Sequence, residues 1–216
     1  MKPVLSIDVF FDFICPWCLI GQRHLERALG QLRAEYPQLQ VNLRWRGVQL
    51  LPNVPAEGLP FEAFYLQRLG SEQAVRHRQA QVKVAANAAG EPIDFSRISR
   101  MPNTADAHRL LERAVALGNP TQVQALLDQL FAGYFHQGKD LGNRSTLLSI
   151  AEGCGLMPAQ VADCLRGDAT PFIGASPAPA SGVPCFSFNQ HRVVSGAQPV
   201  EVLLEVIRES LEEATA

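Results

Sequence analysis

Two cysteines separated by two residues lie where a predicted strand passes into a predicted helix. The segment Cys15-Pro16-Trp17-Cys18 follows the apolar run of residues 5–11 and precedes a stretch with helical periodicity. Cysteines at this spacing can close a small disulfide ring, and the first one falls at the N-terminus of the helix. Unpaired backbone N–H groups and the helix dipole at that end favour a negative charge, here a thiolate. The segment therefore predicts a redox-active dithiol.

The two cysteines are expected to differ in reactivity. A free cysteine has a pKa of about 8.5, and Cys15 is predicted to be more acidic because it caps the helix. Pro16 suits the first helical turn, where its missing N–H leaves no bond unmade. Cys18 lies one turn further on and is predicted to be more buried and less ionised. We therefore predict that Cys15 is the nucleophile, that Cys18 resolves the mixed disulfide, and that Trp17 offers apolar contact area at the rim.

Structural roles for these cysteines are the alternative. A zinc site would need a second pair of ligands at matching spacing. The other cysteines, Cys154, Cys164 and Cys185, form no second pair of this kind. The strand-to-helix context favours redox chemistry, and we predict no metal.

Composition limits the classes of function. The chain has 216 residues, 47% of them hydrophobic, and a formal net charge of −2. It is long enough for one large domain, or for a small domain with an insertion. The charge gives no electrostatic case for nucleic acid or an anionic membrane, and no apolar run reaches the roughly 20 residues of a membrane span. Asp8 and Asp12 interrupt the first apolar stretch, so it is predicted to be a strand and not a signal peptide.

An odd number of cysteines, five, argues against a disulfide-stapled secreted domain. We expect the reducing cytoplasm, unless the chain has lost a presequence. A homodimer is compatible with the sequence, which leaves the oligomeric state open.

The order of predicted elements indicates an α/β fold. Residues 5–11 and 41–45 are predicted strands joined by a helix that ends before Pro37, which implies a parallel pair. Residues 57–167 show helical patterns and no strand signal. After Val183 a hairpin of residues 185–188 and 192–194 is predicted, and Pro199 opens a last helix. We expect one discontinuous domain, 1–56 and 168–216, and a helical insertion domain, 57–167.

Three parts of the chain resemble a known family. They are Phe11-Asp12-Phe13-Ile14-Cys15-Pro16-Trp17-Cys18-Leu19-Ile20-Gly21, then Met101-Pro102-Asn103-Thr104-Ala105-Asp106-Ala107-His108-Arg109-Leu110-Leu111, and finally Ser181-Gly182-Val183-Pro184 with Val194-Ser195-Gly196-Ala197-Gln198-Pro199. Together they resemble the DsbA superfamily, in particular its FrnE-like branch. The resemblance implies a thioredoxin fold with an all-helical domain inserted after the second strand. It also implies thiol–disulfide oxidoreductase activity on thiol or disulfide substrates, without a bound cofactor.

The resemblance also assigns a role to Val183 and Pro184. It implies that Pro184 is cis and faces Cys15 across the substrate groove, so that backbone groups of Val183 can pair with a bound peptide. The alternative is that Pro184 only starts a strand. The chain departs from the family pattern at residues 170–180, where three prolines predict a loop in place of a helix.

Further candidates have two interpretations each. Asp12 is either a buried proton relay for Cys18 or, more plainly, a solvated strand-end aspartate or a turn cap. Asn103 and His108 are possible substrate contacts, but a helix cap and an interface histidine are the favoured interpretations. Cys185 could approach Cys15, but a small buried hydrophobe is the favoured interpretation. Cys154 and Cys164 could form a regulatory disulfide, but two unpaired buried thiols are favoured in a reducing compartment.

Two other functions remain as alternatives. Kappa-class glutathione transferases and 2-hydroxychromene-2-carboxylate isomerases share this fold and use glutathione. In that branch a serine usually stands at the first active-site position and the second cysteine is absent, so Cys15 and Cys18 argue against it. The third alternative is a non-catalytic binding module with an unreactive dithiol.

Overall fold

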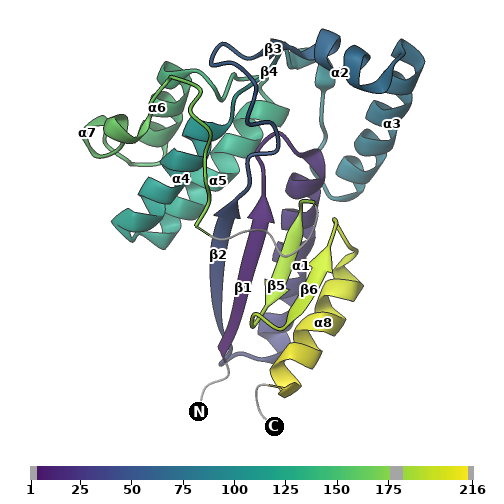
Figure 1. Ribbon diagram of the computed structural model, residues 1–216. Coiled ribbons are helices and arrows are strands. Elements are labelled where there is room, and N and C mark those ends of the chain that lie inside the picture. The colour runs from purple at the N-terminus through teal and green to yellow at the C-terminus, as the bar shows by residue number, and fades with distance from the viewer. Residues whose placement is uncertain (1–3, 176–181, 214–216) are drawn as a thin grey trace. The chain divides into compact units, whose positions relative to one another are not determined.

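The computed structural model describes residues 4–175 and 182–213 (Figure 1). The chain divides into two compact units, one formed by residues 1–48 and 174–216 and the other by residues 49–173. Each unit is described by itself below. The domain limits given in the sequence analysis stay a prediction.

The first unit contains a four-stranded mixed sheet in the order β2-β1-β5-β6. Strands β1 and β2 are parallel, whereas β5 pairs antiparallel with both β1 and β6. This β-α-β segment followed by a hairpin and a helix is the order that the sequence predicts. The elements are β1 (Val4–Phe11), α1 (Pro16–Glu35), β2 (Gln40–Gly47), β5 (Cys185–Phe188), β6 (Arg192–Ser195) and α8 (Val200–Glu213).

One face of this sheet carries the core of the unit. Alternate residues of β1, among them Leu5, Ile7 and Val9, point to that face and are at most 2% exposed. They pack with Phe186 of β5 and with apolar residues of α1 and α8, the two helices that cover this face in Figure 1. The N-terminus of α1 is therefore anchored at the carboxyl end of β1.

The hairpin between β5 and β6 turns at Asn189 and Gln190. Both have positive φ angles, 49° and 64°, and they belong to the three-residue connection between the paired residues Phe188 and Arg192. The Asn189 side chain accepts a hydrogen bond from the Ser6 backbone N–H at 3.0 Å and donates one to the Ser210 carbonyl at 3.0 Å. The turn thus ties the hairpin to β1 and to α8.

The second unit is mainly helical, as the sequence predicts for the insertion. Helices α4, α5 and α6 bury leucine and phenylalanine side chains against one another, and Tyr134 donates a hydrogen bond to the Met101 sulfur at 3.8 Å. Its described elements are α2 (Phe61–Leu69), α3 (Glu72–Ala88), η1 (Phe95–Arg97), α4 (Ala105–Leu117), α5 (Pro120–Phe135), α6 (Arg144–Gly153), α7 (Pro158–Val161) and η2 (Ala162–Cys164).

The expectation that this region has no strand is wrong. Two short strands, β3 (Leu59–Pro60) and β4 (Arg100–Met101), pair antiparallel in the second unit. Two residues are too few to produce an alternating pattern, so no periodicity predicts these strands.

The loop predicted after the helical region is confirmed for residues 170–175, which contain no helix. The rest of the predicted loop, up to residue 180, lies outside the described residues. Among the helices that the structure describes, none is both long and apolar enough to cross a membrane.

Candidate active site

The Cys15-Pro16-Trp17-Cys18 segment forms the start of α1, directly after a tight turn from β1. Cys15 is the N-cap residue and Pro16 occupies the first helical position. The Cys15 N–H donates to the Asp12 carbonyl at 3.1 Å, and the Cys18 N–H donates to the Cys15 carbonyl at 3.0 Å. These bonds fix the backbone of both cysteines. The predicted position of Cys15 at the helix start is confirmed, although its side chain accepts no capping hydrogen bond.

Both cysteines are free thiols, and they differ in environment. Cys15 retains 7% of its exposed surface, whereas Cys18 retains 2%. The Cys18 thiol donates a hydrogen bond to the Cys15 sulfur. Burial first, and this hydrogen bond second, raise the pKa of Cys18 well above its ordinary value. Cys18 is therefore the deeper, protonated member of the pair, as the sequence predicts.

Asp12 lies fully buried beside the dithiol. Its negative charge is the smallest of the causes that raise the pKa of Cys18, after burial and two effects of Cys15, and a backbone hydrogen bond of Asp12 lowers that pKa by more. The burial disagrees with the interpretation of Asp12 as a solvated strand-end residue. An acid–base group next to the thiol that must lose its proton is what a proton relay requires.

The segment before β5 brings Val183 and Pro184 to the dithiol within the same unit. The Val183–Pro184 peptide bond is cis, so this prediction is confirmed. The Cys15 thiol donates to the Val183 carbonyl oxygen, with 3.7 Å between sulfur and oxygen. Pro184 is buried, and its carbonyl accepts the Gly196 N–H at 2.8 Å. Residues 168 positions apart in the chain thus meet at one sulfur.

Gly21 is a feature of the site that sequence reasoning missed. A Cβ atom at this position of α1 would lie 3.1 Å from Pro184 Cγ and 3.1 Å from Phe186 Cζ. The absent side chain lets α1 approach the proline and β5 closely. A glycine inside a helical pattern lowers the stability of the helix, so its presence indicates that close packing excludes a side chain there. That glycine was the available signal in the sequence.

Pro16 and Trp17 are half-buried at the helix start, where a substrate could touch them. Asn103 and His108 belong to the helical unit and are 4% and 1% exposed. The Asn103 amide accepts from Gln49 Nε2 and from the Ala105 N–H at 2.9 and 3.0 Å. This burial favours the structural interpretation of both residues, and a contact of either with substrate stays a prediction.

The remaining cysteines are free thiols whose pKa values are raised, in each case mainly by burial. The Cys164 thiol donates to the Val161 carbonyl at 3.0 Å. Over the described residues, no group of three or more histidine, cysteine, aspartate or glutamate side chains is arranged to hold a metal ion.

Comparison with known proteins identifies the family of this arrangement. The family model of the DSBA-like thioredoxin domain matches residues 6–208. No curated protein sequence matches the chain significantly.

Solved structures share the fold over nearly the whole chain. A probable DsbA oxidoreductase from Streptomyces coelicolor matches with a TM-score of 0.79 and 26% identity, covering 97% of this chain and 91% of its own. A 2-hydroxychromene-2-carboxylate isomerase matches with a TM-score of 0.63 and 14% identity over 97% and 98% of the two chains. The cytosolic disulfide reductase DsbM from Pseudomonas aeruginosa, solved with GSH, matches with a TM-score of 0.54 and 18% identity over 94% and 99%. The predicted thioredoxin fold with a helical insertion is confirmed.

Proposed function

The chain belongs to the DSBA-like thioredoxin domain family and is a thiol–disulfide oxidoreductase, and we propose that Cys15 is its nucleophile and Cys18 its resolving thiol. The observation that carries this assignment is the asymmetry of the pair. Cys18 is buried and donates its proton toward the Cys15 sulfur, while Cys15 lies at a helix N-terminus and retains the larger exposed fraction. Both the donated hydrogen bond and the helix dipole stabilise a negative charge on Cys15.

In the first step the Cys15 thiolate attacks one sulfur of a substrate disulfide. The substrate S–S bond breaks, a mixed disulfide forms between Cys15 and the attacked sulfur, and the other substrate sulfur leaves as a thiolate. In the second step Cys18 loses its proton and attacks the Cys15 sulfur. A Cys15–Cys18 disulfide forms and the second substrate thiolate leaves, so the substrate gains two electrons and the enzyme loses two. The same steps in reverse oxidise a substrate dithiol.

Asp12 is the proposed acceptor of the Cys18 proton. It lies buried next to that thiol, and its charge already acts on Cys18. Removing the proton is the difficult part of the second step because the pKa of Cys18 is raised. A buried carboxylate near the sulfur would supply a path for the proton that bulk water cannot, since Cys18 is only 2% exposed.

Val183 couples substrate binding to attack in this proposal. Its carbonyl accepts from the Cys15 thiol across a long and therefore weak contact of 3.7 Å. A backbone N–H of an extended substrate peptide that bonds to the same carbonyl would displace the thiol and free the sulfur to ionise. Pro16, Trp17 and Pro184 would then contact the substrate on either side of the sulfur.

The proposal includes the branch of the family and the cellular compartment. The FrnE-like branch remains the proposed place of the chain within its family, on the quoted segments. The reducing cytoplasm is the proposed compartment, because an odd number of cysteines, five, argues against a disulfide-stapled secreted domain.

An insulin-reduction assay with dithiothreitol tests the assignment. The wild-type protein and the control Cys154→Ser, which removes another buried thiol, are expected to accelerate insulin precipitation equally. Cys15→Ser is expected to reduce the rate to that of dithiothreitol alone. Full activity of Cys15→Ser would show that the nucleophile is misassigned.

Glutathione dependence separates the second candidate function. The second candidate is a glutathione-dependent enzyme of the 2-hydroxychromene-2-carboxylate isomerase class. The chain is similar to such an isomerase, although that likeness shows the fold alone. Turnover with dithiothreitol and no glutathione supports the dithiol mechanism. Activity that appears only when glutathione is added supports the alternative.

A further inference from the structure

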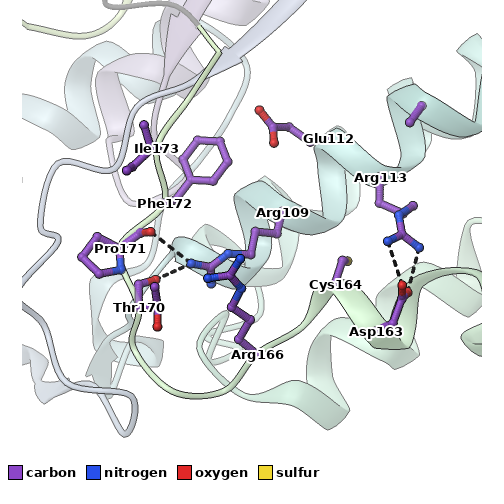
Figure 2. Close-up of a pocket in the computed structure, with 11 residues that line it drawn as sticks. Arg109, Glu112, Arg113, Asp163, Cys164, Arg166, Thr170, Pro171, Phe172 and Ile173 are labelled. Atoms are coloured by element: carbon purple, nitrogen blue, oxygen red, sulfur yellow. Dashed lines mark hydrogen bonds and ion pairs between the residues drawn. The ribbon is translucent and has the colours of Figure 1, made fainter.

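The helical unit contains an open cavity of about 660 Å³ between α4 and the segment of residues 163–173 (Figure 2). This volume falls within the range of about 300–1,000 Å³ typical of small-ligand sites. Nothing in the redox mechanism uses it.

One wall of the cavity is held in place by Arg109. Its guanidinium donates to the Thr170 carbonyl and, at 3.1 Å, to the Pro171 carbonyl, as the dashed lines in Figure 2 show. Asp106 accepts from the same guanidinium at 2.6 Å and from the Gly167 backbone N–H at 2.7 Å. These bonds fix the segment that returns from η2.

Phe172 closes the inner end of the same wall. Its ring stacks on the buried His108 ring with 5.0 Å between centroids, and its N–H donates to Gln49 Oε1 at 2.7 Å. The cavity is therefore preformed, and a ligand would not have to order its walls.

The charged residues that line the cavity leave a formal excess of one positive charge. Arg109, Arg113 and Arg166 line it together with only two acidic residues, Glu112 and Asp163. The Arg113 guanidinium donates two hydrogen bonds to Asp163, at 2.7 and 2.9 Å. The Arg109 guanidinium is occupied by Asp106 and by the carbonyl groups of Thr170 and Pro171.

Arg166 is the arginine that remains available. Its backbone N–H donates to Asp106 at 3.0 Å, which anchors the residue, and its guanidinium makes no hydrogen bond or ion pair within the described part of the chain. Arg166 lines the cavity together with Arg109, which is paired with Asp106. An exposed arginine without such a partner on the wall of a cavity favours an anion there.

We propose that this cavity binds an acidic peptide segment, with a carboxylate on the Arg166 guanidinium and a neighbouring apolar side chain against Phe172 and Ile173. Ile173 is 89% exposed at the rim, an apolar surface without cover in the described residues. One uncommitted guanidinium beside an apolar wall suits a single carboxylate on a partly apolar chain. A phosphate dianion would need more uncommitted donors than the cavity offers. The proposal is independent of the redox function.

Fluorescence anisotropy with a labelled peptide, Gly-Leu-Glu-Leu-Glu-Gly, tests the proposal on the full chain. The acidic peptide is expected to bind saturably, and its isostere with glutamine in place of glutamate to bind about tenfold or more weakly, because a charge-assisted bond is replaced by a neutral one. Equal affinity of the two peptides, or no binding of the acidic one, overturns the proposal.

Variants locate the binding in the cavity. Arg166→Gln is expected to weaken binding about tenfold, whereas Arg33→Gln, which removes an exposed arginine of α1, is expected to leave it unchanged. Ala116→Tyr fills the cavity without changing charge and is expected to abolish binding. Circular dichroism confirms that each variant is folded. If Arg166→Gln or Ala116→Tyr binds like the wild type, the peptide sits elsewhere and the proposal is wrong. Displacement of the peptide by equimolar inorganic phosphate would instead identify an oxyanion site and also overturn it.

Discussion

The Cys15 thiol donates a hydrogen bond to the Val183 carbonyl oxygen, so the sulfur at the start of α1 and the backbone before the cis proline form one site. The same Val183 carbonyl is the acceptor that a backbone N–H of an extended substrate would use, so substrate binding and the Cys15 thiol compete for one oxygen.

Cys18→Ser is expected to trap the enzyme on its substrate. Without the resolving thiol, the mixed disulfide at Cys15 has no internal route to break down and accumulates. Non-reducing electrophoresis with a disulfide-bonded substrate, followed by peptide mapping, measures the adduct. The adduct should map to Cys15, and Cys164→Ser should form none. An adduct that maps to another cysteine would contradict the order of attack.

The reduced protein should lose stability above the ordinary cysteine pKa because of Cys18. Its folded-state pKa is raised, so the thiol stays protonated in the folded chain while it ionises in the unfolded chain. Its contribution is fully present below about pH 8.5 and falls by at most about 1.4 kcal/mol per pH unit above that, up to the folded pKa. Urea unfolding in reductant at pH 7, 9 and 10 measures it.

Cys18→Ser is the control for this pH dependence, since Cys154, Cys164 and Cys185 also have raised pKa values and remain in the variant. The wild type should lose more stability than the variant between pH 9 and 10. Parallel curves would show that Cys18 is not held protonated by the fold.

Asp12→Asn separates the two effects assigned to this carboxylate. Loss of its charge should lower the pKa of Cys18, which alone would shorten the life of the mixed disulfide. Loss of a proton relay should lengthen that life, by about 100-fold for general acid–base catalysis, and should dominate. Stopped-flow measurement of the second step decides between them. A faster second step in Asp12→Asn rules out the relay, and Glu205→Gln on the exposed side of α8 should leave the rate unchanged.

Gly21→Ala is expected to destabilise the protein by about 1–3 kcal/mol, because the added methyl group overpacks the contact of α1 with Pro184 and Phe186. Gly30→Ala is the matched control in the same helix. No atom lies within 4 Å of a Cβ there, so the change should stabilise by about 0.5–1 kcal/mol through helix propensity alone. Thermal or urea unfolding of both variants measures the difference. Equal effects would show that the close approach at Gly21 is unimportant.

The features that could be predicted from the sequence depend on residues that are close together in the chain. The position of Cys15 at a helix start, the burial of Cys18 and the order of strands and helices all depend on neighbouring residues or on periodic patterns. The cis bond before Pro184 followed from a family resemblance, not from the residues alone. The three prolines of residues 170–180 excluded a helix by sterics.

The features that were missed depend on segments that only the fold brings together. The need for glycine at position 21 arises from Phe186, which is far away in the chain. The bonds of Asp106 to Arg109 and to the backbone of Arg166 and Gly167 span up to 61 positions and leave no local pattern. The burial of Asp12 was one of two open interpretations, because a polar residue at a strand end is equally compatible with solvent.

Equilibration of the protein in glutathione redox buffers, read by intact mass and peptide mapping, tests the central claim most directly. The account predicts a cooperative loss of two hydrogen atoms per chain as the buffer becomes oxidising, with the new disulfide joining Cys15 to Cys18. A disulfide between any other cysteines, or a Cys15–Cys18 pair that stays reduced in every buffer, would contradict it.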